Sequence, residues 1–147
     1  MKLRPAEITD IPSMKQLADR TAGAPKWSDH AYSDLFPQSA RMTYVVEVDR
    51  KLVGWAAARA SGDDWELENI VVDENVRRSG IGSALLNTIV RAGRDAKAHR
   101  MHLEVRASNW PARSLYVKAG FEEFGVRPKY YDSPQEDAVL YALVLLH

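Results

Sequence analysis

The segment 67–89 constrains the fold more strongly than any other part of the chain, because three local patterns follow one another in it. It starts with a short apolar run, rich in β-branched residues, that is typical of a well-buried strand: Leu67, Ile70, Val71 and Val72. A polar break at 73–75 precedes the basic turn Arg77-Arg78-Ser79-Gly80-Ile81-Gly82. Residues at the spacing of one helix face follow, namely Ile81, Ala84, Leu85, Thr88, Ile89 and Ala92. The segment therefore predicts a strand, a turn and an amphipathic helix.

The start of this helix is a predicted anion-binding site. Its first N–H groups lack intrahelical partners, and the helix dipole places a partial positive charge there. Gly80 and Gly82 let a ligand approach the backbone closely. Arg77 and Arg78 add mobile positive charge, so the site suits a pyrophosphate. The alternative is an ordinary loop with solvated arginines. The Walker pattern is absent, and GxGxxG fails because Leu85 stands where a third small residue is needed.

Length and composition favour a single-domain globular protein. The 147 residues suit one domain, 1–147, with a sizeable core. The 20 basic and 20 acidic side chains balance, so no net field indicates a nucleic acid or a membrane as partner. The chain has no cysteine, which excludes disulfides and thiolate chemistry and fits a reducing cytoplasm. No apolar signal core opens the sequence, and the longest apolar run, 138–146, is too short to cross a bilayer.

Turn residues and periodicity predict the element order β-α-α-β-β-β-α-β-α-β-β. The predicted strands cover residues 2–6, 42–48, 52–60, 65–73, 100–106, 121–126 and 136–146, and a polar loop is expected at 127–135. The first predicted helix begins at a cap on Thr9 or Asp10 and ends at Gly23 and Pro25, and the second begins near Ser28 and ends at Pro37. The third begins after Gly80 and ends near Ala98, and the fourth runs from Trp110 to Ala119. Because a helix joins strands 65–73 and 100–106, these two should be parallel neighbours in a mixed α/β sheet.

The strand 100–106 alternates between an apolar and a polar face. Its apolar face carries Met101, Leu103 and Val105, and its polar face carries His102, Glu104 and Arg106. Parallel strands are usually covered on both faces. The polar face is therefore expected to line a cleft rather than to meet open water.

Three side chains are candidates for acid–base chemistry. Glu104 could act in such a cleft as a general base, directly or through a water, or could simply form an ion pair with His102 or Arg106. His102 is a rival base on the same face, although a lone histidine is more often structural. Tyr116 lies on the inner face of the predicted helix 110–119, so it could be a core residue or could offer its hydroxyl to a leaving thiolate. No histidine and carboxylate cluster has convincing metal-ligand spacing.

The turn 77–82 matches the Q/R-x-x-G-x-G/A signature of the GCN5-related N-acetyltransferases (GNAT). Within that superfamily, several segments resemble the bacterial ribosomal-protein-alanine N-acetyltransferases (RimI type): 25–28, 66–70, 103–109, 115–121, 127–131 and 136–138. The glycine turn and Tyr-x-x-x-Gly-Phe are shared across the superfamily, whereas Leu-Glu-Val-Arg-x-Ser-Asn and Tyr-Tyr are more specific. The resemblance covers nearly the whole chain. It implies a mixed, mostly antiparallel sheet whose central parallel pair splays around acetyl-CoA, flanked by helices.

The resemblance also implies roles for individual residues. Glu104 corresponds to the proposed base of the RimI-type enzymes, and Tyr116 corresponds to the proposed acid. Acetyl-CoA, without a metal, would be bound by Ile70, Val71, Val72, Arg77, Arg78, Ser79, Gly80, Ile81, Gly82, Ser83 and Asn109. Asn109 could equally be only a helix cap. Backbone N–H groups near Val71 and Val72 would polarise the thioester carbonyl. Trp27, Tyr130 and Tyr131 would line the acceptor side. Trp27 belongs to a group of four large side chains, with Tyr32, Leu35 and Phe36, that could instead be a helix packed on the sheet.

The implied reaction is acetyl transfer to a protein N-terminal α-amine, on ribosomal protein S18 or a similar N-terminus. An α-amine of pKa about 8 costs roughly 1.4 kcal/mol to deprotonate at pH 7, against more than about 4 kcal/mol for lysine. One departure from the RimI-type pattern, Lys26 between Pro25 and Trp27, falls where the acceptor side is shaped. The alternatives are a small-molecule amine or a lysine as acceptor, and a non-catalytic acyl-CoA-binding module. The oligomeric state does not follow from the sequence.

Overall fold

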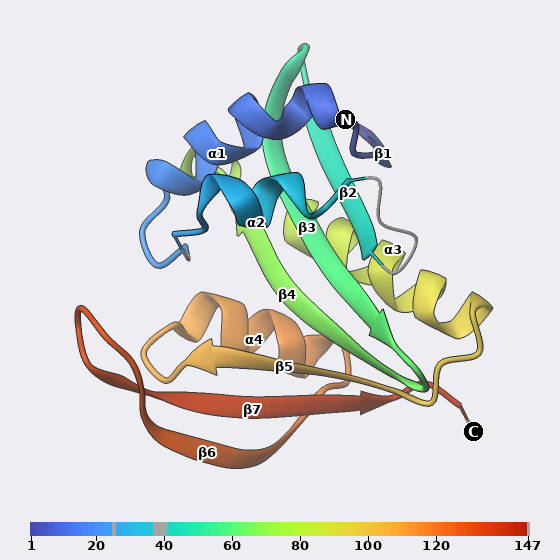
Figure 1. The fold of residues 1–147 in the computed structure, drawn as a ribbon, viewed down its shortest axis with the longest axis vertical. Coiled ribbons are helices and arrows are strands. Elements are labelled where there is room, and N and C mark those ends of the chain that lie inside the picture. Colours follow the sequence, from blue (N-terminus) through green and yellow to red (C-terminus); the bar gives the residue numbers. More distant parts are fainter. Residues whose placement is uncertain (25, 37–40, 147) are drawn as a thin grey trace.

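A computed structural model describes residues 1–24, 26–36 and 41–146 of the chain. Its strands are β1 (Lys2–Pro5), β2 (Arg41–Val48), β3 (Lys51–Ser61), β4 (Asp64–Val72), β5 (Arg100–Arg106), β6 (Glu122–Tyr131) and β7 (Glu136–Val144). Its helices are α1 (Ile11–Asp19), α2 (Asp29–Ser33), α3 (Ile81–Asp95) and α4 (Trp110–Lys118), with short 3₁₀ helices η1 (Ile8–Asp10) and η2 (Glu74–Val76). The predicted order of strands and α-helices is confirmed (Figure 1). Pro25 and Pro37, predicted helix stops, lie outside the described residues.

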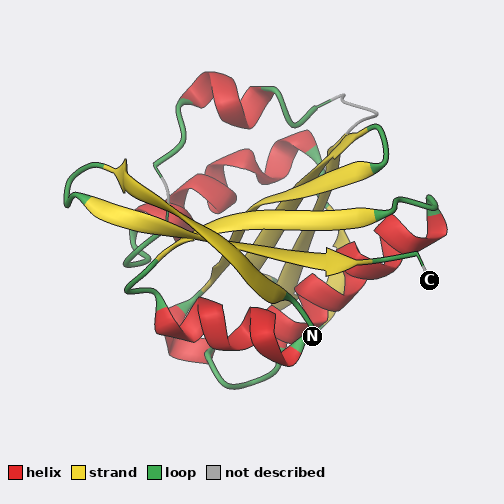
Figure 2. Cartoon of the chain, turned by 90° about the horizontal axis from the view of Figure 1, so that it is seen from below, coloured by secondary structure: helices red, strands yellow, loops and turns green. Residues whose placement is uncertain are grey.

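The strands form a seven-stranded sheet in the order β1-β2-β3-β4-β5-β7-β6. The neighbours β4 and β5 are parallel, and all other neighbouring pairs are antiparallel. Helices lie on both sides of the sheet (Figure 2). Residues of α3 and α4 contribute to one hydrophobic core and residues of α1 and α2 to a second, so the sheet is covered on both faces. No helix in the described part of the chain is long and apolar enough to cross a membrane.

The parallel pair is short. It joins only three positions, Asp64 with Arg100, Trp65 with Met101 and Glu66 with His102. Beyond this seam β4 continues along β3 and β5 continues along β7, so the sheet divides into two leaves, β1–β4 and β5–β7 (Figure 1). Gly93 of α3 packs over the seam: a Cβ there would lie 3.0 Å from Leu145, 3.5 Å from Met101 and 3.6 Å from Trp65. The predicted splaying of the central parallel pair is confirmed.

A β-bulge reverses the direction of side chains halfway along β4. Leu67 and Asn69 pair with consecutive residues of β3, so Glu68 is an extra residue in the strand. Leu67 lies in the core beneath α3, whereas Val71, four residues later, lies in the core beneath α1 and α2. Without the bulge these two residues would face the same side. Asn69 therefore shares the α1–α2 side with Val71.

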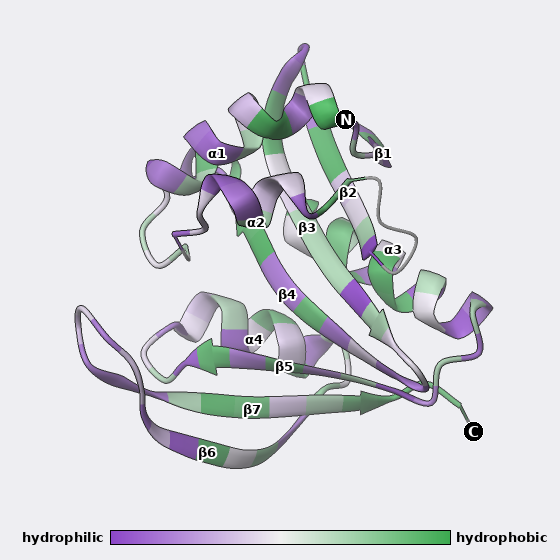
Figure 3. Ribbon diagram, viewed as in Figure 1, coloured by the Kyte–Doolittle hydropathy of each residue, from purple (hydrophilic) through white to green (hydrophobic). Residues whose placement is uncertain are grey.

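Strand β6 is longer than predicted, which corrects the expected loop. The sequence analysis ends this strand at 126 and places a polar loop at 127–135, but β6 runs to Tyr131 beside β7. It is an edge strand exposed along almost its whole length, so no apolar alternation marks it, in contrast to the more hydrophobic β7 beside it (Figure 3). Tyr130 and Tyr131 thus belong to a strand and not to a loop. Helix α1 also differs, since it ends at Asp19, before the predicted stop at Gly23.

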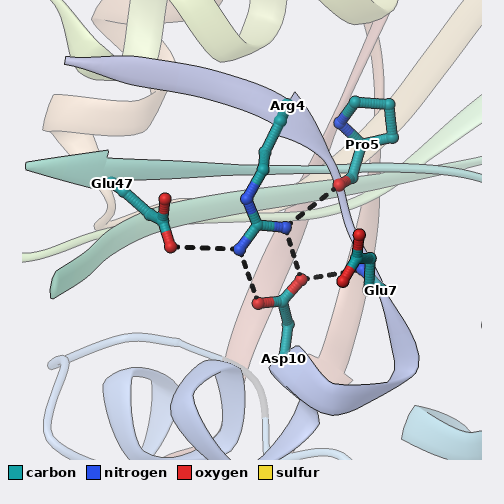
Figure 4. A network of polar contacts seen from close by, with 5 residues as sticks. All are labelled: Arg4, Pro5, Glu7, Asp10 and Glu47. Carbon is teal, nitrogen blue, oxygen red and sulfur yellow. Dashed lines mark hydrogen bonds and ion pairs between the residues drawn. The ribbon is translucent and has the colours of Figure 1, made fainter. Parts of the chain in front are cut away.

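Asp10 is the N-cap residue of α1, as predicted, but its side chain ties β1 to the start of the helix instead of bonding to an N–H of α1. Its carboxylate accepts hydrogen bonds from both terminal nitrogens of Arg4, each at 2.8 Å, and from the Glu7 N–H at 2.7 Å (Figure 4). Arg4 also donates to Glu47 of β2 at 3.1 Å. No N–H of α1 bonds to the Asp10 side chain. The hydrogen bonds from Arg4 lower the pKa of the Asp10 carboxyl.

Candidate active site

A cavity of about 1750 Å³ opens where the two leaves separate. Typical small-molecule pockets hold roughly 300–1,000 Å³, so this one has room for two substrates. Most residues predicted for the site line it, namely Trp27, Ile70, Val71, Val72, Arg77, Arg78, Gly80, Ile81, Gly82, Ser83, Glu104, Asn109, Tyr116, Tyr130 and Tyr131. The exception is Ser79, whose hydroxyl donates to the Val76 carbonyl within the turn. The structure therefore brings the candidates from both halves of the chain to one place.

The turn before α3 has the geometry of an anion site. Gly80 is the N-cap residue of α3, with a left-handed φ of 85° that side chains disfavour. Gly82 allows close packing, because a Cβ there would lie 3.3 Å from Leu115 and 3.7 Å from Val72. The first N–H groups of this 15-residue helix lack intrahelical partners, and the exposed Arg77 and Arg78 precede them. These groups fit the pyrophosphate of acetyl-CoA.

A carboxylate close to this turn is neutralised by its own partners. Asp73, at the end of β4, is buried and accepts hydrogen bonds from the Asn75 N–H and from Arg20, each at 3.0 Å. These bonds lower the pKa of the Asp73 carboxyl. Arg20 follows α1, so this ion pair ties the first helix to the anion site. The sequence offered no signal for this long-range contact.

Glu104 lies on β5 with its side chain about one-fifth exposed, and it has a partner that the sequence analysis missed. Its Oε1 accepts a hydrogen bond from Nη1 of Arg127 at 2.8 Å. The predicted alternatives, His102 and Arg106, instead approach glutamates on β4 and β7. The error follows from the loop assignment, because Arg127 reaches Glu104 only when β6 continues past residue 126.

Acidic side chains on this side of the cavity each have a basic neighbour. The pairs are Glu66 with His102 at 3.9 Å, Glu68 with Arg41 at 2.9 Å and Glu104 with Arg127 at 2.8 Å. The amide nitrogen of Asn69 is buried without a hydrogen-bond partner among the described residues. Within the same residues, no group of three or more His, Cys, Asp or Glu side chains could hold a metal ion.

Tyr116 of α4 is a core residue that also lines the cavity. It is 5% exposed, and its ring packs against Phe121 at 5.9 Å and Tyr141 at 6.1 Å between centroids. It also lines the cavity. Burial raises the pKa of its phenol far above the ordinary value, so the hydroxyl stays protonated at neutral pH. A core tyrosine with a protonated hydroxyl at the cavity can donate a proton.

Aromatic side chains from opposite ends of the chain form two walls. Trp27 packs against Tyr32 and Trp55, with centroid distances of 5.6 and 5.4 Å. The rings of Tyr130 and Tyr131 lie edge to face at 5.0 Å. Burial, followed by the charge of Glu104, raises the pKa of Tyr131 to about 12. The predicted acceptor residues are thus placed around one cavity, although 102 residues lie between Trp27 and Tyr130 in the sequence.

Arg106 fixes the turn that follows the second wall. It donates to the backbone carbonyls of Pro134 at 2.9 Å and Asp132 at 3.0 Å, and its guanidinium lies 4.5 Å from the ring centroid of Tyr131. It also pairs with Glu136 at 3.3 Å. Glu136 in turn accepts a hydrogen bond from the Ser108 N–H at 2.6 Å. The sequence analysis placed Arg106 on the polar face but did not identify this role.

Asn109 acts as a helix cap in the structure. Its Oδ1 accepts a hydrogen bond from the Ala112 N–H at 3.3 Å, at the start of α4. Asn109 also lines the cavity, so the structure does not separate its two expected roles.

The fold and the cavity define an acetyl-CoA-dependent N-acetyltransferase. Residues 11–121 match the acetyltransferase (GNAT) family, and the chain belongs to this family.

Relatives of the chain include ribosomal-protein and N-terminal acetyltransferases. It is 32% identical over 140 residues to the [ribosomal protein bS18]-alanine N-acetyltransferase of Escherichia coli (strain K12), with 93% of each chain covered. It is 32% identical over 160 positions to an N-alpha-acetyltransferase of Sulfurisphaera tokodaii, covering 98% of this chain and 93% of that one. The crystal structure of the ribosomal-protein-S18-alanine N-acetyltransferase from Escherichia coli superimposes with a TM-score of 0.90 at 29% identity, covering 99% of this chain and 94% of that chain.

Proposed function

We propose that this enzyme acetylates the α-amino group at the N-terminus of a protein, with ribosomal protein S18 as the acceptor to test first. The observation that carries the proposal is the single cavity in which the anion site, Glu104, Tyr116 and two aromatic walls meet. The names of the relatives support the choice of acceptor. The large volume supports simultaneous binding of cosubstrate and peptide, as direct transfer requires.

The donor side of the cavity would bind and polarise the thioester. Acetyl-CoA supplies the acetyl group in activated form. The start of α3, with Arg77 and Arg78, would hold its pyrophosphate. Asp73 donates its N–H to Val53 of β3 at 2.8 Å, and successive N–H groups of a strand point to opposite edges. The Val72 N–H therefore points to the free edge at the split, where it can donate to the thioester carbonyl.

Glu104 and Tyr116 would carry out the proton transfers of the reaction. Glu104 would take a proton from the acceptor ammonium, directly or through a water, so that the free amine can attack the carbonyl carbon. The bond from carbon to sulfur would then break, and the thiolate would take a proton from the Tyr116 hydroxyl. The proton that the attacking nitrogen loses as the amide forms would restore the phenol. An α-amine costs roughly 1.4 kcal/mol to deprotonate at pH 7, so a single carboxylate is sufficient for an N-terminus.

The test is acetyl transfer to a synthetic peptide with the S18 N-terminus, beside the same peptide with a blocked α-amine. Mass spectrometry locates the acetyl group. Acetylation of the free N-terminus alone is the expected result. Acetylation of lysine in both peptides would assign a lysine acetyltransferase, and transfer only to small amines would assign a small-molecule enzyme. Binding of acetyl-CoA without transfer to any amine would favour an acyl-CoA-binding module.

A further inference from the structure

The proposed base already holds a cation. Arg127 of β6 donates a hydrogen bond to Glu104 of β5 at 2.8 Å, across the strand β7 that lies between them. An acceptor ammonium that is to lose its proton to Glu104 must reach the same carboxylate. Two positive groups therefore need one small acidic site, which makes Arg127 part of the binding equilibrium of the acceptor.

The other charged or titratable groups near this carboxylate are committed elsewhere or carry no positive charge. On β5, His102 approaches Glu66 at 3.9 Å, and Arg106 is bound to Glu136 and to two backbone carbonyls. From β6, Tyr130 and Tyr131 contribute neutral phenols, whose pKa values are raised by the Glu104 carboxylate and by burial respectively. Among the described residues, Arg127 is thus the cation that touches Glu104.

The Arg127 side chain can move away from Glu104 without loss of folded structure. Its side chain is 52% exposed, and its guanidinium lies 4.2 Å from the ring centroid of Tyr130. The guanidinium contacts this ring while it is bound to Glu104, so the ring still offers a favourable contact for the charge when another cation takes the carboxylate. An exposed ion pair contributes little to the stability of the fold, so replacing Arg127 at the carboxylate by another cation costs little free energy.

We propose that Arg127 is a resident competitor at Glu104, and that the acceptor ammonium binds by exchanging with its guanidinium. The exchange selects acceptors that arrive as cations, since an uncharged group cannot replace the guanidinium at the carboxylate. The inference rests on the proposed function for the peptide acceptor. The exchange itself needs only an ammonium group on the acceptor, so the inference applies equally to a small amine.

The experiment compares Arg127→Gln with Arg127→Lys on the full chain, and uses Arg91→Gln as a matched loss of one exposed positive charge on α3. Removing the competitor should lower KM for the acceptor about twofold to fivefold, the range of an exposed ion pair, and leave kcat within about twofold. Arg127→Lys keeps a cation and should retain the wild-type KM. Arg91→Gln should change neither constant. A supporting role in folding predicts the opposite sign, a higher KM or a lower kcat, and that result would overturn the proposal.

A second measurement tests the selection for charge. A des-amino peptide, in which propionyl replaces the N-terminal alanyl group, is used as a competitive inhibitor. Arg127→Gln should strengthen binding of the alanyl peptide and leave the inhibition constant of the des-amino peptide unchanged. Equal changes for both peptides would show that Arg127 acts on the peptide chain and not on its ammonium. If the wild type acetylates no peptide, the proposed acceptor is wrong, and the same comparison with propylamine still tests the exchange.

Discussion

The two sides of the cavity are built in different ways. The proposed donor side comes mainly from one segment, 67–89, and it offers the backbone of the free edge of β4 and of the first turn of α3, together with the side chains of Arg77 and Arg78. The acceptor side combines side chains from three distant parts of the chain, Trp27, Glu104 and the Tyr130–Tyr131 pair, held by ion pairs of arginines. Donor binding thus depends on backbone conformation, whereas acceptor binding depends on contacts that single substitutions can remove.

The largest expected effect comes from the proposed base. Glu104→Gln keeps the size of the side chain and removes its basicity, so kcat should fall roughly 10²- to 10⁴-fold. The affinity for acetyl-CoA should stay at the wild-type value, because the donor side is unchanged. Steady-state kinetics and calorimetric titration with acetyl-CoA measure the two quantities. An unchanged kcat would remove Glu104 from the mechanism, and Tyr116→Phe tests the acid in the same way.

A glycine substitution should break the donor side selectively. Gly80→Ala forces a side chain into the left-handed region and should cost about 1–2 kcal/mol of unfolding free energy. Displacing an N–H that bonds to a phosphate should also weaken acetyl-CoA binding roughly tenfold. Gly62→Ala is the matched control, since Gly62 also has positive φ with open space around it but lies outside the cavity lining. It should lose the same stability with no loss of affinity; equal losses of affinity would refute the role of the turn.

The aromatic wall should matter for peptides and not for small amines. Tyr131→Ala removes one ring of the second wall, so KM for the peptide should rise about fivefold to tenfold, as expected for loss of an aromatic contact. The KM for propylamine and the affinity for acetyl-CoA should not change. A parallel rise for propylamine would mean that Tyr131 shapes the whole cavity and does not act in peptide recognition.

The smallest effect concerns a region outside both sides, the Asp10 ion pair. The pKa of Asp10 is lowered in the folded state, so its contribution to stability is present above the unfolded pKa of about 4. It is lost as the pH falls through the folded pKa. Asp10→Asn should therefore lower the unfolding free energy by about 1 kcal/mol at pH 7, with the difference shrinking below about pH 4. Urea titrations at pH 7 and in the acidic range measure it; a constant difference would exclude the linkage.

The donor side was predictable because its signals are local. The helix spacing after Gly80, the two glycines and the alternation of β5 all depend on neighbouring residues, and the structure shows these elements at the expected positions. The parallel pairing of β4 and β5 followed from the helix that joins them, whereas the splaying of this pair was implied by the family resemblance. Local patterns thus located the cavity and the strand that carries Glu104.

The acceptor side was only partly predictable, because its contacts join distant residues. Nothing near Arg127 in the sequence marks it as a partner of Glu104, and the exposed edge strand that carries it lacks an apolar pattern. The bulge at Glu68 is equally hidden, since a one-residue insertion in a strand is defined by the pairing with β3. Tyr130 and Tyr131 were identified through the family resemblance, whereas Trp27 was also indicated by the group of large side chains around it.

Because the parallel pairing of β4 and β5 is short, a small rotation of one leaf about this seam moves the far ends of the two strands relative to each other by a larger distance. From Glu66 to Val72 the strand extends for six residues, about 20 Å at the usual rise, so a rotation of about 5° at the seam shifts its far end by nearly 2 Å. A misplacement of about 1 Å can cost a catalytic site two orders of magnitude in rate. Gly93 packs over this seam and lies outside the cavity lining, so a larger side chain there would change the spacing of the two leaves without touching either substrate.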